Sequence, residues 1–172
     1  AQERFGGPVP GVAPITVFEQ AWVSGAFASA GAMTAAPAAL VESLHAAIGE
    51  FGAPAGAGLP PDSDDTAAAL VALAEMDSPR SVDCLWPYHV DPYFTCFPGE
   101  RTISTSTNAH VLQALGAYQP NNPDERAKHQ DTVDRLCAWL RDCQEMDGSW
   151  WDKWHASPFY ATACCAVALA EY

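Results

Sequence analysis

Positively charged side chains are scarce in this sequence. Its 172 residues include eight Lys and Arg against 21 Asp and Glu, which gives a formal net charge of -13. Nucleic-acid binding requires a basic surface facing the phosphates, so this imbalance excludes nucleic acid as the main partner. An anionic small ligand would have to be held by a few local cations, a metal ion or helix N-termini.

The sequence also lacks an apolar run long enough to span a bilayer, although 49% of its residues are hydrophobic. It has no initiator Met and no signal-peptide pattern. The final residues, YATACCAVALAEY, are typical of a helix that stops without a cap. We therefore expect a protein without a membrane span, of which this chain is one piece.

Metal-binding and disulfide patterns are missing despite six cysteines, because no two of them form a CxxC pair. Cys137 and Cys143 are six positions apart, which suits neither a zinc knuckle nor a zinc finger. Cys164 and Cys165 lie inside an apolar helical run. We expect reduced cysteines that act as small core residues of a cytoplasmic protein.

Strand-like alternation of apolar and polar residues is absent as well, and the apolar positions instead recur at helical spacing. The predicted fold class is therefore all-α. Helices are predicted over residues 15–29, 37–51, 64–76, 108–118, 122–146 and 157–172. Residues 1–14 are predicted to be an extended lead-in, and the Pro-rich segment 77–102 a long ordered loop.

An internal repeat indicates how these helices are arranged. Residues 65–76 (DTAAALVALAEM) and 161–172 (ATACCAVALAEY) share seven of twelve positions, and an amphipathic helix with a Gly-containing turn precedes each. This pattern predicts stacked αα-hairpins in which outer helices alternate with apolar inner ones. The inner helices then run the same way. We expect their N-termini, with Asp62 to Asp65, Asn108, His110 and the loop 147–158, to line one end of one cavity.

Three carboxylates stand at the start of one inner helix, in LPPDSDDTAAAL (59–70). An EF-type calcium loop beginning at Asp62 would need Gly and Glu where the sequence has Ala67 and Leu73. A DxDxT phosphotransfer nucleophile would need a preceding buried strand, which PAGAGLPP cannot form. A DDxxD magnesium cluster would need an acid at Ala68. None of these three chemistries fits.

Proton donation remains. In a group of aspartates, the charge of its neighbours can hold one carboxyl protonated. After the proton leaves, hydrogen bonds and the helix N-terminus stabilise the anion, while the apolar helix provides a dry pocket for a carbocation. The structural alternative is that Asp62 or Ser63 caps the helix and the other aspartates decorate its first turn.

The segment DSDDTA (62–67) resembles the DxDDTA motif of class II terpene cyclases, which start cyclisation by protonating a double bond. FEQAW (18–22) resembles the FEHIW stretch of the plant diterpene members, and residues 94–115 resemble their FFCFAGQST region. QEMDGSWWDKW (144–154) resembles the QxxDGSW repeat of the superfamily followed by DKW. The alanine-rich style is most similar to bacterial ent-copalyl diphosphate synthases.

The resemblance implies a role for each aspartate. Asp64 is the expected general acid, which protonates the terminal alkene of geranylgeranyl diphosphate, and Asp62 and Asp65 polarise or orient it. His110 stands where the plant enzymes have an asparagine that hydrogen-bonds the acid. Asn108, two residues earlier, is the other candidate for that partner.

The resemblance also implies substrate-binding residues. Lys153 matches a lysine implicated in holding the diphosphate, and Trp154, Trp86 and Tyr160 are aromatic candidates for the cavity mouth. Aromatic faces stabilise a carbocation by about 0.5–2 kcal/mol each. Gln144, Asp147, Gly148 and Trp150 are expected to tie helix hairpins together. Mg²⁺ is expected to bind through the diphosphate, at an acidic site outside this chain, and no metal site is expected within it.

Size is the main departure from the family. A complete class II cyclase places its active site between two helical barrels, called β and γ, and this chain matches about half of that. We expect a single domain over residues 1–172, which forms an incomplete αα-barrel of β type. The γ domain is expected on the rest of the same polypeptide. The fragment alone is expected to show no turnover. The alternatives are a halimadienyl-type or squalene–hopene-type cyclase, or an inert αα-barrel scaffold.

Overall fold

The computed structural model describes residues 15–32, 37–118 and 123–172. The predicted lead-in, residues 1–14, lies outside the described residues. The helices are α2 (Thr16–Ser29), α3 (Ala38–Ala47), α4 (Ser63–Glu75), the 3-10 helix η1 (Asp83–Tyr88), α5 (Thr105–Ala117), α6 (Pro123–Asp142) and α7 (Phe159–Leu169). The short strands are β1 (Ala53–Pro54), β2 (Pro61–Asp62), β3 (His89–Val90) and β4 (Tyr93–Phe94). The all-α prediction is confirmed.

Every predicted helix is present, with shifted ends. Helix α5 begins three residues before the predicted start, because the side chain of Ser104 accepts a hydrogen bond from the Thr107 amide and caps the helix. Helix α3 ends at Ala47, four residues early, and Gly49 and Gly52 form a bridge instead. Helix α6 also ends four residues before the predicted end.

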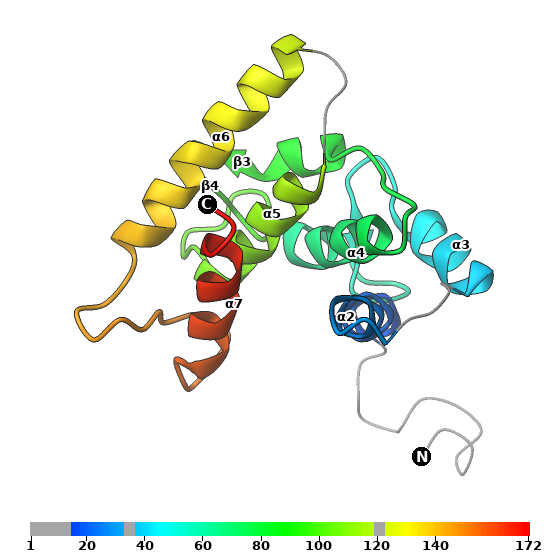
Figure 1. The fold of residues 1–172 in the computed structure, drawn as a ribbon, viewed down its shortest axis with the longest axis horizontal. Coiled ribbons are helices and arrows are strands. Elements are labelled where there is room, and N and C mark those ends of the chain that lie inside the picture. Colours follow the sequence, from blue (N-terminus) through cyan, green and yellow to red (C-terminus); the bar gives the residue numbers. More distant parts are fainter. Residues whose placement is uncertain (1–14, 33–36, 119–122) are drawn as a thin grey trace.

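Helices α2, α4, α5 and α7 form one layer in which neighbours pack against each other in that order. Figure 1 shows α6 outside α5 and α3 outside α4. Inner helices are therefore apolar on more than one side, and α4 buries eight of its thirteen residues. This alternation of inner and outer helices is the arrangement predicted from the repeat, as an open arc in the described part of the chain.

No strand ladder is expected from the sequence, and this expectation is wrong at two places. Strand β1 pairs antiparallel with β2, and β3 pairs antiparallel with β4. Each ladder has two residues per strand, which is too short to produce a readable alternation. The first ladder matters for the site because it pairs Ala53 with Asp62, immediately before α4.

All six cysteines have free thiols, and five of them are buried. Four of them, Cys84, Cys137, Cys164 and Cys165, belong to the hydrophobic core, and Cys143 packs against it, as expected of small core residues. In the described ranges, no helix is both long and apolar enough to cross a membrane.

Gly52 fixes the segment that leads to α4. Its φ is +92°, and a Cβ built there would lie 2.1 Å from Oγ1 of Thr66, the hydroxyl that accepts a hydrogen bond from the Ala53 amide at 2.8 Å. We expect Gly52→Ala to lower the free energy of unfolding by about 2 kcal/mol or more, from backbone strain and steric clash together. Gly58→Ala, with φ +84° but open space around it, is the matched control for strain alone.

Denaturant unfolding of the whole protein that contains this chain measures the two effects. Equal destabilisation by Gly52→Ala and Gly58→Ala would contradict a specific contact between Gly52 and Thr66.

Candidate active site

A cavity of about 460 Å³ opens at the N-termini of the inner helices. Its walls come from the start of α2, α4, α5 and α7 and from the loops beside them. The residues that line it are Ile15, Phe18, Ala55, Leu59, Pro60, Asp62, Asp64, Asp65, Cys96, Phe97, Ser106, Trp154, His155 and Tyr160. The structure therefore brings the three aspartates and part of loop 147–158 to one mouth, as the repeat predicted.

Asp62 is the N-cap of α4. One of its carboxylate oxygens accepts a hydrogen bond from the Asp65 amide at 2.8 Å, and its side chain is 5% exposed. Burial raises the pKa of Asp62 above 3.8, against the lowering effect of its hydrogen bonds with Asp65. Asp62 therefore caps the helix, as the structural alternative predicted, and it also lines the cavity.

Asp64 is paired with His110, which joins α4 to α5. Nδ1 of His110 lies 2.7 Å from Oδ1 of Asp64, and the two side chains are 4% and 24% exposed respectively. Burial opposes protonation of His110, but the hydrogen bond to Asp64 and the charge of that carboxylate outweigh it, and the pKa of His110 rises to about 10. The site therefore keeps a cation in contact with Asp64 at neutral pH.

Asp65 is held uncharged next to this pair. Burial, the hydrogen bond with Asp62 and the charges of Asp62 and Asp64 raise the pKa of Asp65 to about 9. The expectation that neighbours would hold one of the three carboxyls protonated therefore corresponds to Asp65 in the structure. Asp64 differs from it by its contact with a cation.

Asn108 is not brought to the aspartates. Its amide accepts a hydrogen bond from the Phe94 backbone at 2.8 Å and donates to the carbonyls of Phe94 and Ser104. These contacts fix strand β4 against α5. Residues two apart on a helix point in different directions. Of the two candidates on α5, the structure brings only His110 to the acid.

Tyr160 and Trp154 line the cavity as expected, but Trp86 does not. Trp86 packs against His89 and Phe94, and it borders a different pocket on the side of η1. The sequence could not reveal this, because the segment 77–102 folds back through η1 and the β3–β4 ladder.

Lys153 does not line the cavity either. Its ammonium group makes an ion pair with Glu100, donates to the Thr102 carbonyl and lies 4.6 Å from the centre of the Trp154 ring. These partners hold Lys153 at the edge of the loop that carries Trp154. A role for Lys153 at the diphosphate stays a prediction.

Three residues of the site were missed by the sequence analysis. Trp22 packs edge-on against His110, with centroids 5.6 Å apart, and lies 5.7 Å from Tyr160. His155 lines the cavity and stacks on Tyr160 at 4.3 Å. Asp152 is buried and accepts hydrogen bonds from Ser106, which lines the cavity. Trp22 could have been found from the FEQAW resemblance, whereas the DKW resemblance contains Asp152 and precedes His155 but singles out neither residue.

The QxxDGSW segment ties the last hairpin together mainly through Trp150. Its indole Nε1 donates to the Leu140 carbonyl of α6 at 2.7 Å, and its amide donates to the Thr162 hydroxyl of α7 at 3.0 Å. Gln144 donates to the Gly148 carbonyl, and Asp147 accepts from Ser149, so these two side chains close the turn locally.

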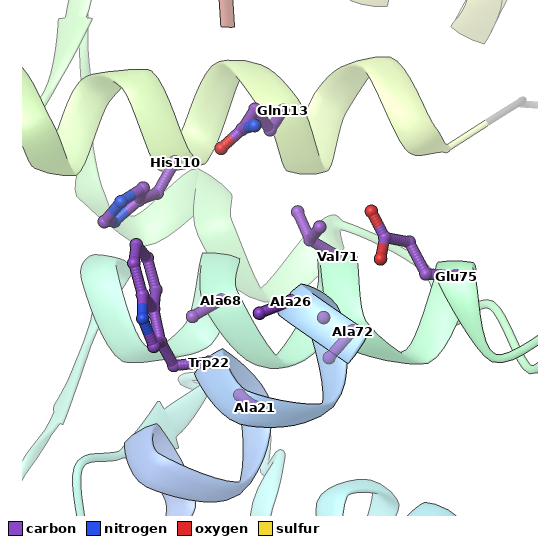
Figure 2. Close-up of a pocket in the computed structure, with 10 residues that line it drawn as sticks. Ala21, Trp22, Ala26, Ala68, Val71, Ala72, Glu75, His110 and Gln113 are labelled. Carbon is purple, nitrogen blue, oxygen red and sulfur yellow. The ribbon is translucent and has the colours of Figure 1, made fainter. Parts of the chain in front are cut away.

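A second, smaller cavity of about 190 Å³ lies on the other side of His110, between α2, α4 and α5. Figure 2 shows Trp22 and His110 facing each other at one end, and Glu75 at the other. Four of the ten residues that line it are alanines. His110 lines this second cavity and not the first, contrary to the expectation that it lines one mouth with the aspartates, and it reaches the first cavity only through its contact with Asp64.

The aspartates do not converge as metal ligands do. Across the described residues, no three His, Cys, Asp or Glu side chains are placed to hold an ion together. Asp62 caps α4 and Asp64 faces a cation, so these carboxylates are not free to form a cation cage. The described residues do not fit a magnesium site.

Comparison with known proteins supports the resemblance to diterpene cyclases. No protein-family model matches the chain. It is 53% identical over 170 residues to the ent-copalyl diphosphate synthase of Streptomyces sp. (strain KO-3988), covering 99% of this chain and 33% of that protein. It is 41% identical over 169 residues to the labda-7,13-dienyl diphosphate synthase of Streptomyces clavuligerus, covering 98% of this chain and 31% of that protein. The chain spans about one third of the length of these curated relatives.

Solved structures agree. The ent-copalyl diphosphate synthase from Streptomyces platensis matches with a TM-score of 0.90 and 53% identity, over 99% of this chain and 33% of that one. The Arabidopsis thaliana ent-copalyl diphosphate synthase, at 19% identity, shares the fold with a TM-score of 0.62, over 89% of this chain and 22% of that one.

The chain is therefore homologous to one segment of the class II diterpene cyclases. Within that class, its close relatives are the bacterial ent-copalyl diphosphate synthases, as the sequence resemblance indicated.

The raised pKa values predict how stability depends on pH. The folded pKa of Asp65, about 9, exceeds its ordinary value of 3.8, so its contribution to stability is complete below pH 3.8 and is lost as the pH rises towards 9. Asp65→Asn removes this ionisation. We expect the variant to be more stable than wild type at about pH 8, by at least about 1 kcal/mol, and the gap to vanish near pH 4.

Thermal unfolding of the whole protein at both pH values measures this difference. Glu145→Gln, which removes an exposed carboxylate, is the control and should leave the pH dependence unchanged. A variant that unfolds with the wild-type pH slope would show that Asp65 is charged in the folded state.

Proposed function

We propose that this chain is the acid-bearing part of a class II diterpene cyclase. The whole protein would protonate geranylgeranyl diphosphate at its terminal alkene and close the chain to copalyl diphosphate, keeping the diphosphate. The observation that carries this proposal is the contact between Asp64 and buried His110 at the mouth of an apolar cavity. We propose the cytoplasm as its location.

Alkene protonation needs an acid whose anion is stabilised as soon as it forms. Asp64 is the proposed general acid in its protonated form: its O–H bond breaks as the terminal alkene carbon takes the proton, and the ion pair with His110 described above is the state reached after this transfer. The carboxylate that remains accepts a hydrogen bond from the His110 imidazolium. Asp65, which is uncharged below about pH 9, adds no negative charge next to Asp64 in that range, so the anion forms with less repulsion.

The cavity protects the carbocation that follows. Phe18, Phe97, Trp154 and Tyr160 present aromatic rings to it, and the faces of such rings attract cations. The apolar wall residues exclude water, which would otherwise capture the cation. The carbocation then closes the rings and loses a proton to a base on the rest of the protein.

The diphosphate end of the substrate is proposed to bind outside the described residues. Their strong excess of carboxylates and the pairing of Lys153 with Glu100 leave few cations for it. Mg²⁺ supplies charge neutralisation for a diphosphate, and we propose that acidic residues of the γ domain hold it.

The ent-copalyl product is favoured by the 53% identical relative. The labda-7,13-dienyl diphosphate synthase supports a second candidate, in which the same protonation and ring closure end with loss of a different proton. Analysis of the product separates the two candidates. An inert scaffold role does not account for a buried imidazole that faces the middle aspartate.

Replacing Asp64 with Asn in the whole protein should reduce cyclisation of geranylgeranyl diphosphate at least a thousandfold, because the amide has no transferable acidic proton. His110→Gln should reduce it less, by about ten- to a hundredfold, since only stabilisation of the anion is lost. Mass spectrometry of the dephosphorylated products measures both, with Asp147→Asn as an exposed control. Retained cyclisation by Asp64→Asn would remove the proposed acid.

The 172-residue chain by itself should show no turnover, because the described residues offer a cavity but no diphosphate site. Adding geranylgeranyl diphosphate and Mg²⁺ to the purified chain, with the whole protein as positive control, checks this. Copalyl diphosphate formed by the fragment would show that the missing parts are not needed for chemistry.

A further inference from the structure

We propose that Asp152 is a positioning residue for the acid site, because its carboxylate joins the helix that carries His110 to the loop that carries Trp154 and His155. Neither resemblance nor residue pattern assigned a role to this residue. The expected effect of Asp152 on turnover rests on the proposed function, whereas its effect on the position of His110 does not.

One carboxylate oxygen of Asp152 binds the first turn of α5. It accepts hydrogen bonds from the Ser104 hydroxyl at 2.6 Å, from the Ser106 amide at 2.9 Å and from the Ser106 hydroxyl at 3.0 Å, with the Thr105 hydroxyl at 3.4 Å. These partners lie 46 to 48 residues away in the sequence. Asp152 therefore acts as a second, long-range cap on α5, beside the local cap made by Ser104.

The other oxygen binds the loop. It accepts a hydrogen bond from the Trp154 amide at 2.8 Å, which fixes the backbone just before His155. Trp154 and His155 both line the cavity, and His155 stacks on Tyr160. The two oxygens of one side chain thus hold two walls of the same cavity.

Asp152 keeps its negative charge although it is only 8% exposed. Burial works to raise the pKa of Asp152, but the hydrogen bonds from Ser104, Ser106 and Trp154 together outweigh it and lower that pKa. Its position at the N-terminus of α5 adds the favourable interaction of an anion with the helix dipole. The charge is therefore needed for the full set of hydrogen bonds.

Helix α5 transmits this anchor to the acid. Ser106 and His110 are four residues apart, so they lie on the same face of α5, one turn from each other. His110 then contacts Asp64 at 2.7 Å. A displacement of the first turn moves His110 relative to Asp64, and a misplacement of about 1 Å at such a pair reduces a rate by about a hundredfold.

Other contacts keep the loop folded when the charge of Asp152 is removed. The Thr105 hydroxyl donates to the Trp151 carbonyl at 2.8 Å, and Trp150 donates to the Leu140 carbonyl at 2.7 Å. The ion pair of Lys153 with Glu100 also remains. An Asp152→Asn variant is therefore expected to fold with a loosened junction.

The test uses Asp152→Asn in the whole protein, with Asp147→Asn as the matched control, since Asp147 lies in the same loop but is exposed and bonds only Ser149. We expect Asp152→Asn to lower kcat for geranylgeranyl diphosphate by at least tenfold and to change KM less than about threefold, and Asp147→Asn to change neither. A Tm loss without a kcat change would mean a merely structural role.

NMR of the histidine imidazoles gives a readout that does not depend on turnover. His110 faces Asp64 on α4, Tyr160 and Cys164 on α7, and Trp22 on α2, with Asp65 close enough to interact electrostatically. Loosening its contact with Asp64 should make His110 lose its proton at a lower pH in Asp152→Asn than in wild type. An unchanged titration of His110 together with unchanged kcat overturns the proposal.

The two proposals fail in distinguishable ways. If the wild-type protein does not cyclise geranylgeranyl diphosphate, the proposed function fails, and the His110 titration still decides the role of Asp152. If Asp152→Asn does not fold, Ser104→Ala removes the 2.6 Å hydrogen bond from outside the cavity and takes its place. Ser104→Ala should then lower kcat and shift the His110 titration in the same direction, and a failure to do both overturns the proposal.

Discussion

The contact between His110 and Asp64 is the interaction on which the rest of this site depends. It joins two inner helices at their N-terminal mouth and places a buried cation against a partly exposed carboxylate. Burial alone would remove the charge of the imidazole, and His110 keeps it because its hydrogen bond to Asp64 and the charge of that carboxylate outweigh burial. The surrounding features either hold these two side chains in place or keep competing charge away from them.

The neighbouring aspartates divide these tasks. The side chain of Asp62 caps α4, and its backbone pairs with Ala53 in the ladder between β1 and β2. Asp62 therefore fixes the backbone that carries Asp64. Asp65 is kept uncharged by burial and by its neighbours. Three carboxylates within four positions therefore become a helix cap, the partner of His110 and a neutral group, because each meets a different environment.

The side chains of residues 150–154, on the other wall of the cavity, also have separate tasks. Trp150 fastens the last hairpin to α6 and α7, Lys153 fastens the loop to Glu100, and Asp152 fastens it to α5. These side chains thus hold the backbone of the loop in place, whereas Trp154 and Tyr160 line the cavity. A rigid mouth of this kind is what a reactive cation requires, since a mobile one would admit water.

Periodicity, repetition and local motif were enough to predict the helices, their alternation of inner and outer layers, the common mouth and the aspartate cluster. The packed fold was needed to show that His110 rather than Asn108 meets Asp64, that Trp86 borders another pocket, and that Asp152 joins two walls. Those outcomes depend on where each side chain points, and for His110 and Asp152 on partners 46 to 48 residues away, which no local pattern encodes.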